Sequence, residues 1–298
     1  MLYVALCILA NVTFIMLFRA FPGHGVNTFH AIVVNYFVCV VTGLVFIGDL
    51  TLIQPLSLPT VPVIMALALG VVAIFGFVFM AQTAQQLGTS VVSIASKMAL
   101  VVPVCFSLFI FQYISKTFTI FNYAGLVLAL PAIFMSAYKP QNIHVDKRKA
   151  NRLLALPLAV FLIGGFIDTS MTYINRNFLD PIERANYPIY IFFVAAMVGL
   201  LMVLFKREKI NWRSWVAGVA LGIPNYFSLY FLLSALEAFE SDGAVLFPIN
   251  NIGIILFSTL GGIVLFGERI SSLNFAGLVL SVIVIVLVSY QELFQFIF

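Results

Sequence analysis

The segments 122-NYAGLVLALPAIFMSAY-138 and 274-NFAGLVLSVIVIVLVSY-290 match without a gap at an offset of 152 residues. The same offset aligns 66-ALALG-70 with 218-GVALG-222. Two unrelated Leu- and Val-rich segments would resemble each other locally, but they would not keep one offset across separate parts of the chain. The sequence therefore predicts two homologous halves.

The composition predicts that these halves lie in a membrane. Of the 298 residues, 63% are hydrophobic and 9% are charged, whereas a soluble domain carries roughly 25% charged residues. The apolar segments are apolar all round and do not alternate, which favours membrane-spanning helices over barrel strands. Runs of about 20 apolar residues lie near 1–18, 29–47, 60–82, 89–111, 118–138, 153–174, 186–205, 213–235, 243–266 and 273–296.

The halves comprise residues 1–138 and 153–298, and a polar linker at 139–152 joins them. Because each half has five predicted helices, an odd number, the second half must begin on the side where the first one ended. We therefore expect an all-α integral membrane protein with ten transmembrane helices in two inverted five-helix repeats. This arrangement is typical of secondary transporters that bind their cargo between the repeats, near the midplane of the membrane.

Lys and Arg residues predict the orientation of the helices. Eleven of them follow the odd-numbered helices: Arg19, Lys139, Lys147, Arg148, Lys149, Arg152, Lys206, Arg207, Lys209, Arg213 and Arg269. Three follow the even-numbered helices: Lys116, Arg176 and Arg184. Since loops rich in Lys and Arg face the cytoplasm, we expect a multi-pass protein of the inner or plasma membrane with both termini outside the cytoplasm.

Lys97 is a charge inside an apolar segment. It lies eight residues into the fourth predicted helix, about 12 Å along it, and a charge at that depth costs a few kcal/mol. Ser93, one turn earlier, and the adjacent Ser96 make one face of this helix polar. This face could bind a carboxylate or a phosphate, or exchange a proton. The alternatives are a structural ion pair and a shallower placement of the helix.

Asp168 is the second charge inside a predicted helix, and Thr172 continues its polar face one turn later. It lies about 22 Å along the sixth helix, so its depth differs from that of Lys97 by about 10 Å. We therefore expect two separate polar contacts in one cavity and not a direct salt bridge. An interfacial position beside Asn175 and Arg176 is the alternative for Asp168.

Further polar and aromatic candidates lie in other predicted helices. The segment 247-FPINN-251 places Asn250 and Asn251 after a proline, where two amides can bind a polar ligand or join neighbouring helices. Tyr226 and Tyr230 share a helix face and suit a cationic or apolar ligand, although ordinary packing gives the same spacing. Asn11 in the first helix is a weaker candidate.

Several function classes find no support in the sequence. It contains no HExxH, GxSxG or P-loop motif and no Cys/His metal cluster, so we expect neither an enzyme, nor a metal site, nor a cofactor. The three cysteines fall in apolar runs without metal spacing and are expected in the core. The net charge of +4 comes from loop residues and does not predict nucleic-acid binding.

The ten predicted helices, the length of about 300 residues and the segment 265-LFGERISSLNFAGLVL-280 resemble the drug/metabolite transporter superfamily, and the EamA-like exporters most closely. The pair Gly267-Glu268 is the most family-like local feature, and its first-half counterpart is Ser115-Lys116. The Trp-Gly pair common near the first helix of that family is absent. The resemblance implies a transporter of amino acids, drugs, sugars, nucleotide sugars or quaternary amines. It also implies cytoplasmic termini, which conflicts with the Lys and Arg count; we keep the count.

We therefore expect a secondary active transporter, an exporter or exchanger, that moves a small anionic or zwitterionic metabolite such as an amino acid by alternating access at a central cavity. Its partners would be this substrate and the lipid bilayer, with protons or a counter-substrate for coupling, and it would act as a monomer or homodimer. One alternative is a transporter of cations, quaternary amines or drug-like compounds that uses Asp168 and the Tyr226/Tyr230 face. The other is a membrane scaffold or enzyme without cargo.

Overall fold

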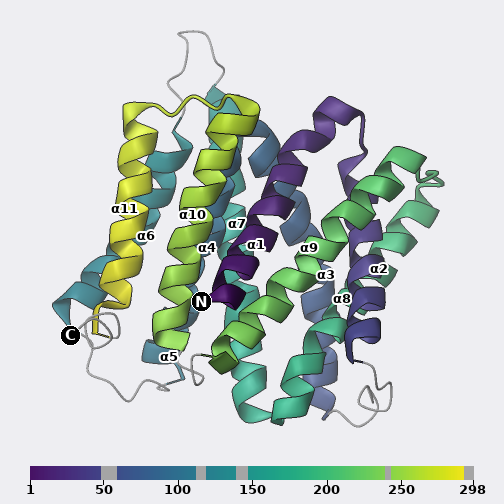
Figure 1. Cartoon of the computed structure of the whole chain (residues 1–298). Helices are drawn as coiled ribbons and strands as arrows, with labels where there is room; N and C mark the ends of the chain where they lie inside the picture. The colour runs from purple at the N-terminus through teal and green to yellow at the C-terminus, as the bar shows by residue number, and fades with distance from the viewer. Residues whose placement is uncertain (48–58, 112–118, 139–146, 239–242, 292–298) are drawn as a thin grey trace.

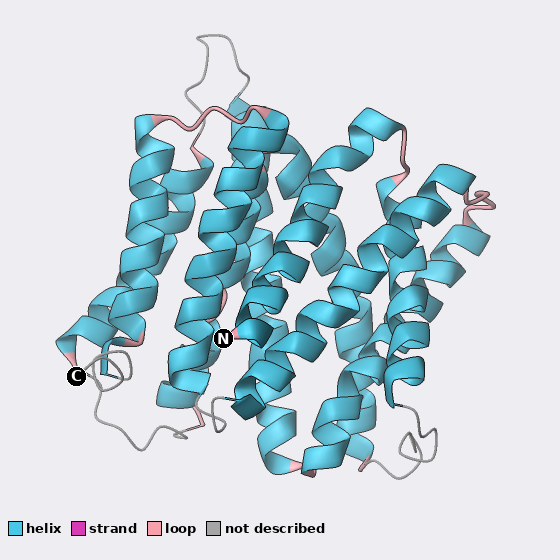
Figure 2. Ribbon diagram, in the orientation of Figure 1, coloured by secondary structure: helices cyan, strands magenta, loops and turns pink. Residues whose placement is uncertain are grey.

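A computed structural model describes residues 1–47, 59–111, 119–138, 147–238 and 243–291. Within these residues the regular structure is helical and contains no strand (Figure 2). The helices are α1 (Leu2–Ala20), the short 3₁₀ helix η1 (Phe21–His24), α2 (Thr28–Ile47), α3 (Thr60–Gln86), α4 (Thr89–Met98), α5 (Val101–Phe109), α6 (Ile120–Ala137), α7 (Lys147–Asn177), α8 (Pro181–Phe205), α9 (Trp212–Ala238), α10 (Gly243–Phe266) and α11 (Ser272–Val288).

The described helices are those of a multi-pass membrane protein. Nine segments are long and apolar enough to cross a membrane, with α4 and α5 counted as one segment. Helix α11 is apolar but shorter, and residues 292–298 of the tenth predicted helix lie outside the described residues. Large apolar side chains such as Val127, Leu204 and Val264 are exposed on the outer surface, where lipid would surround them.

The fourth predicted helix, 89–111, is interrupted. Helix α4 ends at Met98 and α5 begins at Val101, so the interruption follows directly after Lys97. Pro103 explains it, because proline has no N–H to donate to the carbonyl of Ala99 and its ring clashes with that carbonyl. The amide of Val102 donates to the Ala99 oxygen instead, at 3.0 Å.

The linker predicted at 139–152 ends earlier in the structure than at residue 152. Residues 139–146 lie outside the described residues, and α7 already begins at Lys147, so the last six residues of the predicted linker are helical.

Helices α6 and α11 form an antiparallel pair with matching contacts at both ends. Near the start of α6, the Asn122 amide donates to the carbonyls of Leu287 and Val288 at 3.2 and 2.9 Å. Near the start of α11, the Asn274 amide donates to the carbonyls of Met135 and Ser136 at 3.2 and 2.7 Å. The two sets of contacts are related by the offset of 152 residues.

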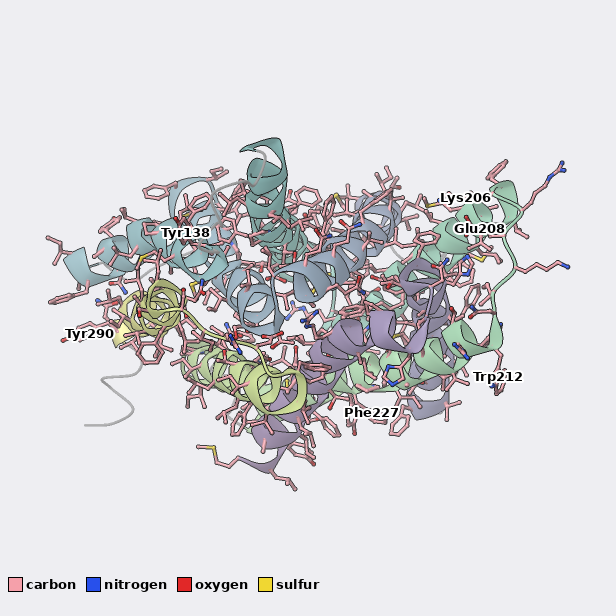
Figure 3. All side chains as sticks on the ribbon, turned by 90° about the horizontal axis from the view of Figure 1, so that it is seen from above. Tyr138, Lys206, Glu208, Trp212, Phe227 and Tyr290 are labelled. Atoms are coloured by element: carbon pink, nitrogen blue, oxygen red, sulfur yellow. The ribbon has the colours of Figure 1, made fainter. Side chains whose placement is uncertain are left out.

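The described helices enclose two large hydrophobic cores and two smaller clusters. Phe18, Tyr36 and Ile74 belong to the core between α1, α2, α3 and α8, whereas Met98 and Ile285 belong to the core between α4, α6, α10 and α11. Seen from above (Figure 3), Tyr138 and Tyr290 mark the end of the molecule formed by α6 and α11, and Lys206, Glu208 and Trp212 mark the other end.

The helix ends define two faces of the molecule. The ends of α1, α8 and α10 lie on the upper face in Figure 1. The end of α3 also lies there, because its Gln85 contacts the end of α1. We call this the basic face, because it carries Arg19, Lys206, Arg207, Lys209, Arg213 and Arg269. The ends of α2, α5, α7 and α9 lie on the opposite face (Figure 1).

Candidate functional site

A cavity of about 580 Å³ lies between the two cores. Side chains from both halves of the chain line it, on helices that run from α1 to α10. Seven of the ten predicted site residues lie on its wall: Asn11, Ser96, Lys97, Asp168, Thr172, Asn250 and Asn251.

Lys97 extends into this cavity from the last turn of α4. Its ammonium donates to Asn11 Oδ1 at 3.2 Å, and the Asn11 amide donates to the Cys7 carbonyl at 2.9 Å. An ammonium has three N–H donors, so the cavity side of Lys97 keeps donors for a ligand. The interruption after Met98 also places Lys97 at a helix C-terminus, whose partial negative charge stabilises a cation.

Asp168 lies on α7, across the cavity, and its side chain is exposed to the cavity space. The Thr172 hydroxyl donates to the backbone carbonyl of Asp168 at 2.8 Å and not to its carboxylate. Lys97 and Asp168 attract each other electrostatically. The two side chains do not come within the 4.0 Å that defines an ion pair.

The other predicted polar residues have different environments. Asn250 is buried, and its Oδ1 has no hydrogen-bond partner among the described residues. Ser96 donates its hydroxyl to the Ser93 carbonyl at 3.1 Å. Because a hydroxyl oxygen still has lone pairs, Ser96 can accept a hydrogen bond from a ligand.

Three predicted site residues lie outside the cavity. Ser93 is buried inside the helix bundle, where its hydroxyl donates to the Ser90 carbonyl at 2.9 Å. Tyr226 and Tyr230 stack on each other, with ring centroids 6.5 Å apart, and both contact Phe46. This aromatic cluster packs α9 against α2. Ordinary helix packing, the alternative given above for the spacing of the two tyrosines, therefore explains their positions.

A different set of aromatic residues lines the cavity. The ring centroid of Tyr36 lies 5.4 Å from that of Phe77 and 6.0 Å from that of Phe192, and the Tyr36 hydroxyl donates to the Ala73 carbonyl at 2.9 Å. Sequence reasoning missed these residues. Their helices are apolar on every side, so no periodic signal distinguishes the cavity side from the lipid side.

The cavity lies closer to the opposite face than to the basic face. Its wall reaches Asn175, two residues before α7 ends, and Phe247, four residues after α10 begins. On α3, by contrast, the wall stops at Met80, six residues before the helix ends on the basic face.

Between the cavity and the basic face lies a group of polar contacts, which we call the Glu268 cluster: Arg19, Gln85, Thr89 and Glu268. The Glu268 carboxylate accepts from the Thr89 amide at 3.0 Å, and it lies 3.0 Å from the Thr89 hydroxyl, whose single proton also has the Ser258 carbonyl as an acceptor at 2.9 Å. It also pairs with Arg19 at 3.2 Å. Arg19 donates in turn to the Gln85 carbonyl at 2.8 Å. The cluster therefore joins the ends of α1, α3 and α10 to the start of α4.

No group of three or more His, Cys, Asp or Glu side chains that could bind a metal ion occurs within the described part of the chain.

Comparisons with known proteins establish the fold but no activity. No family model matches the chain. It is 27% identical over 230 residues to an uncharacterized protein of Haemophilus influenzae, a match that covers 76% of this chain and 75% of that protein. A crystal structure of another protein, 15% identical, overlays with a TM-score of 0.60 on 96% of both chains. At that identity the likeness shows a shared helical fold alone.

Proposed function

We propose that the protein is a secondary active transporter that binds a small zwitterionic metabolite, such as an amino acid, in the central cavity. The observation that carries this proposal is the placement of one cation, Lys97, and one anion, Asp168, on the wall of the same cavity without an ion pair between them. Charges among apolar helices cost a few kcal/mol each. A ligand that brings a carboxylate to Lys97 and an ammonium to Asp168 would offset both costs.

The rest of the wall supports a ligand with an apolar part. Tyr36, Phe77 and Phe192 provide an aromatic surface, and Asn250, whose Oδ1 has no hydrogen-bond partner among the described residues, provides a buried acceptor. A cavity of about 580 Å³ is within the range of small-molecule sites, about 300–1,000 Å³.

The contacts between the halves support ten spanning helices in two inverted repeats. Asn122 and Asn274 differ by 152 residues, and their acceptors Leu287 and Met135 differ by the same offset. The cap residues Thr119 and Ser271 differ by 152 as well. Reciprocal contacts between antiparallel helices are what a two-fold axis in the membrane plane would produce. This architecture agrees with the resemblance to the drug/metabolite transporters.

The unequal packing of the two repeats supports alternating access. Helix α1 packs against α3 and α4 near the basic face, but no comparable packing joins their counterparts α7, α9 and α10 within the described residues. We propose that the basic face is cytoplasmic, by its Lys and Arg content. The termini are then outside, and the cavity is open to the outside in this state. Transport runs as export or exchange, coupled to a gradient of protons or of a counter-substrate.

Binding and transport of matched probes test this proposal. Leucine carries both charges, 4-methylpentanoate only the carboxylate and isopentylamine only the amine on similar carbon skeletons. Lys97→Gln should weaken leucine and 4-methylpentanoate, and Asp168→Asn should weaken leucine and isopentylamine, each by about 30-fold or more, because each variant leaves one ligand charge without its partner. Thermal shift of the purified protein measures binding, and uptake into proteoliposomes measures transport.

The same probes separate the alternatives. Unchanged leucine binding in both variants would contradict the zwitterion site. Binding of isopentylamine that is lost in Asp168→Asn, without any binding of leucine, would favour a cationic cargo. Leucine binding without movement across the vesicle membrane would favour a protein without cargo.

A further inference from the structure

We infer that the Glu268 cluster is the gate that closes the cavity toward the basic face, and that Glu268 holds it shut. This inference rests on the proposed function, because a gate regulates access to the central site. It also explains the Gly267-Glu268 pair, which the cavity does not use.

The backbone directs Glu268 into the bundle. Gly267 ends α10 in the left-handed conformation, with φ of 62°, which residues other than glycine adopt at a cost. The following amide, that of Glu268, turns back and donates to the Gly262 carbonyl at 3.0 Å. As a result, the Glu268 side chain lies against the start of α4, with only 11% of it exposed.

The contacts of Glu268 are specific for an ionised carboxylate. Both of its oxygens accept from the Thr89 amide, at 3.0 and 3.1 Å, at the N-terminus of α4, where the partial positive charge of a helix attracts an anion. Arg19 adds a full positive charge at 3.2 Å. Charge-assisted contacts of this kind are stronger than neutral ones.

The position of these contacts makes them a gate. Lys97 lies on the same helix as Thr89, about 12 Å further along, so the cluster holds the end of a cavity wall. The cluster also fixes α3 to α1, since Gln85 donates to the Phe18 carbonyl at 3.1 Å, and the same amide ties α3 to the start of α2 through the Thr28 hydroxyl at 2.9 Å. Opening toward the basic face requires α3 and α4 to separate from α1 and α10, which breaks the contacts of Glu268.

The space around Glu268 provides a second way to open the gate. A Cβ on Gly262 would lie 2.5 Å from Glu268 Oε2 and would also overlap the Thr89 hydroxyl. Gly262→Ala therefore displaces the carboxylate and keeps its charge. The neighbouring Gly261 is a matched control, because the three atoms nearest to a Cβ there all belong to the flexible side chain of Met16.

Cysteine accessibility in membrane vesicles tests the gate without any transport assay. A cysteine at Met80, on the cavity wall next to the cluster, is labelled with a membrane-impermeant maleimide from each side in turn. The protein with only its native cysteines gives the background. With Glu268 intact, we expect slow labelling from the basic face. Glu268→Gln and Gly262→Ala should each raise this rate about tenfold or more, because they stabilise the state that is open to this face.

Two further variants show that the effect belongs to the gate. Gly261→Ala and Glu208→Gln, which changes the carboxylate in contact with His30 on the same face, should leave the rate unchanged. Equal rates from the basic face in Glu268→Gln, Gly262→Ala and the parent, at normal levels of membrane-inserted protein, would overturn the inference. If the labelling rate rises in Glu268→Gln but the protein transports none of the probes, the result supports the gate and rejects the transport function.

Discussion

Asn11 determines how much of the Lys97 ammonium is available to a ligand. It accepts one N–H of Lys97 at 3.2 Å as a neutral amide, so the positive charge itself stays uncompensated by this contact. Asn11 is in turn held by the Cys7 carbonyl, which fixes the orientation of its side chain. The pair therefore positions a cation without neutralising it.

We predict that Asn11→Asp inactivates the site while stabilising the protein. The new carboxylate has the shape of the amide and would pair with Lys97, which then loses its attraction for the carboxylate of a ligand. Leucine binding should fall by about tenfold or more, and the melting temperature should rise by about 2–4 °C, the change that corresponds to about 1 kcal/mol. Asn225→Asp is the control: Asn225 contacts Asn35 and Cys39 and no cation, so this change should lower the melting temperature. Leucine transport at the parental rate in Asn11→Asp would contradict this role of Lys97.

At the scale of the helix, the interruption between α4 and α5 has an electrostatic consequence. It creates a helix C-terminus inside the apolar region, and Lys97 lies in the last turn before it. The residue that causes the interruption, Pro103, also lines the cavity. Proline thus contributes to the site through the backbone, although its own ring carries no charge.

We predict that Pro103→Ala weakens the binding of leucine by about 2- to 5-fold. The alanine N–H can donate to the Ala99 carbonyl and so join α4 to α5, which removes the helix C-terminus beside Lys97 and its contribution of about 0.3–1 kcal/mol. Binding titrations of the purified protein measure the change. Pro131→Ala, in the continuous helix α6, is the control and should leave binding unchanged. A Pro103→Ala variant that binds leucine as the parent does would exclude this contribution.

The helices also show what the sequence could predict. Their apolar character, and the charges Lys97 and Asp168, follow from composition, because charged residues are conspicuous in apolar segments. The interruption at Ala99 did not follow, because proline is tolerated in many membrane helices and does not break all of them: α10 continues through Pro248. Nor could spacing alone identify Tyr36 as a cavity residue and Tyr226 as a packing residue, because lipid-facing and protein-facing sides are equally apolar.

At the scale of the whole molecule, the two halves match where they pack and differ where they line the cavity. Asn122 and Asn274 make equivalent contacts. By the same offset, Lys97 corresponds to Ile249, and Asp168 to Met16. In the inverted-repeat arrangement that we propose, the two halves would exchange equivalent packing while a single asymmetric site stays between them.

This symmetry leads to a prediction about distances across the molecule. In the present state α1 packs against α3, whereas α7 and α9 make no comparable packing within the described residues. Alternating access should reverse the two arrangements. Spin labels at the exposed residues His24 and Gln86 report the α1–α3 distance on the basic face, and labels at the exposed Asn177 and Glu237 report the α7–α9 distance on the opposite face.

Glu268→Gln should lengthen the His24–Gln86 distance and shorten the Asn177–Glu237 distance in the same sample, by several ångströms each, because opening one face requires closing the other. Double electron–electron resonance measures both distributions, and Glu208→Gln serves as the control that leaves them unchanged. If the first distance lengthens while the second stays constant, Glu268 holds only a local contact, and the two halves do not move as inverted repeats. If both distances change in opposite directions, the two halves move as the inverted repeats we propose, with one face closing as the other opens.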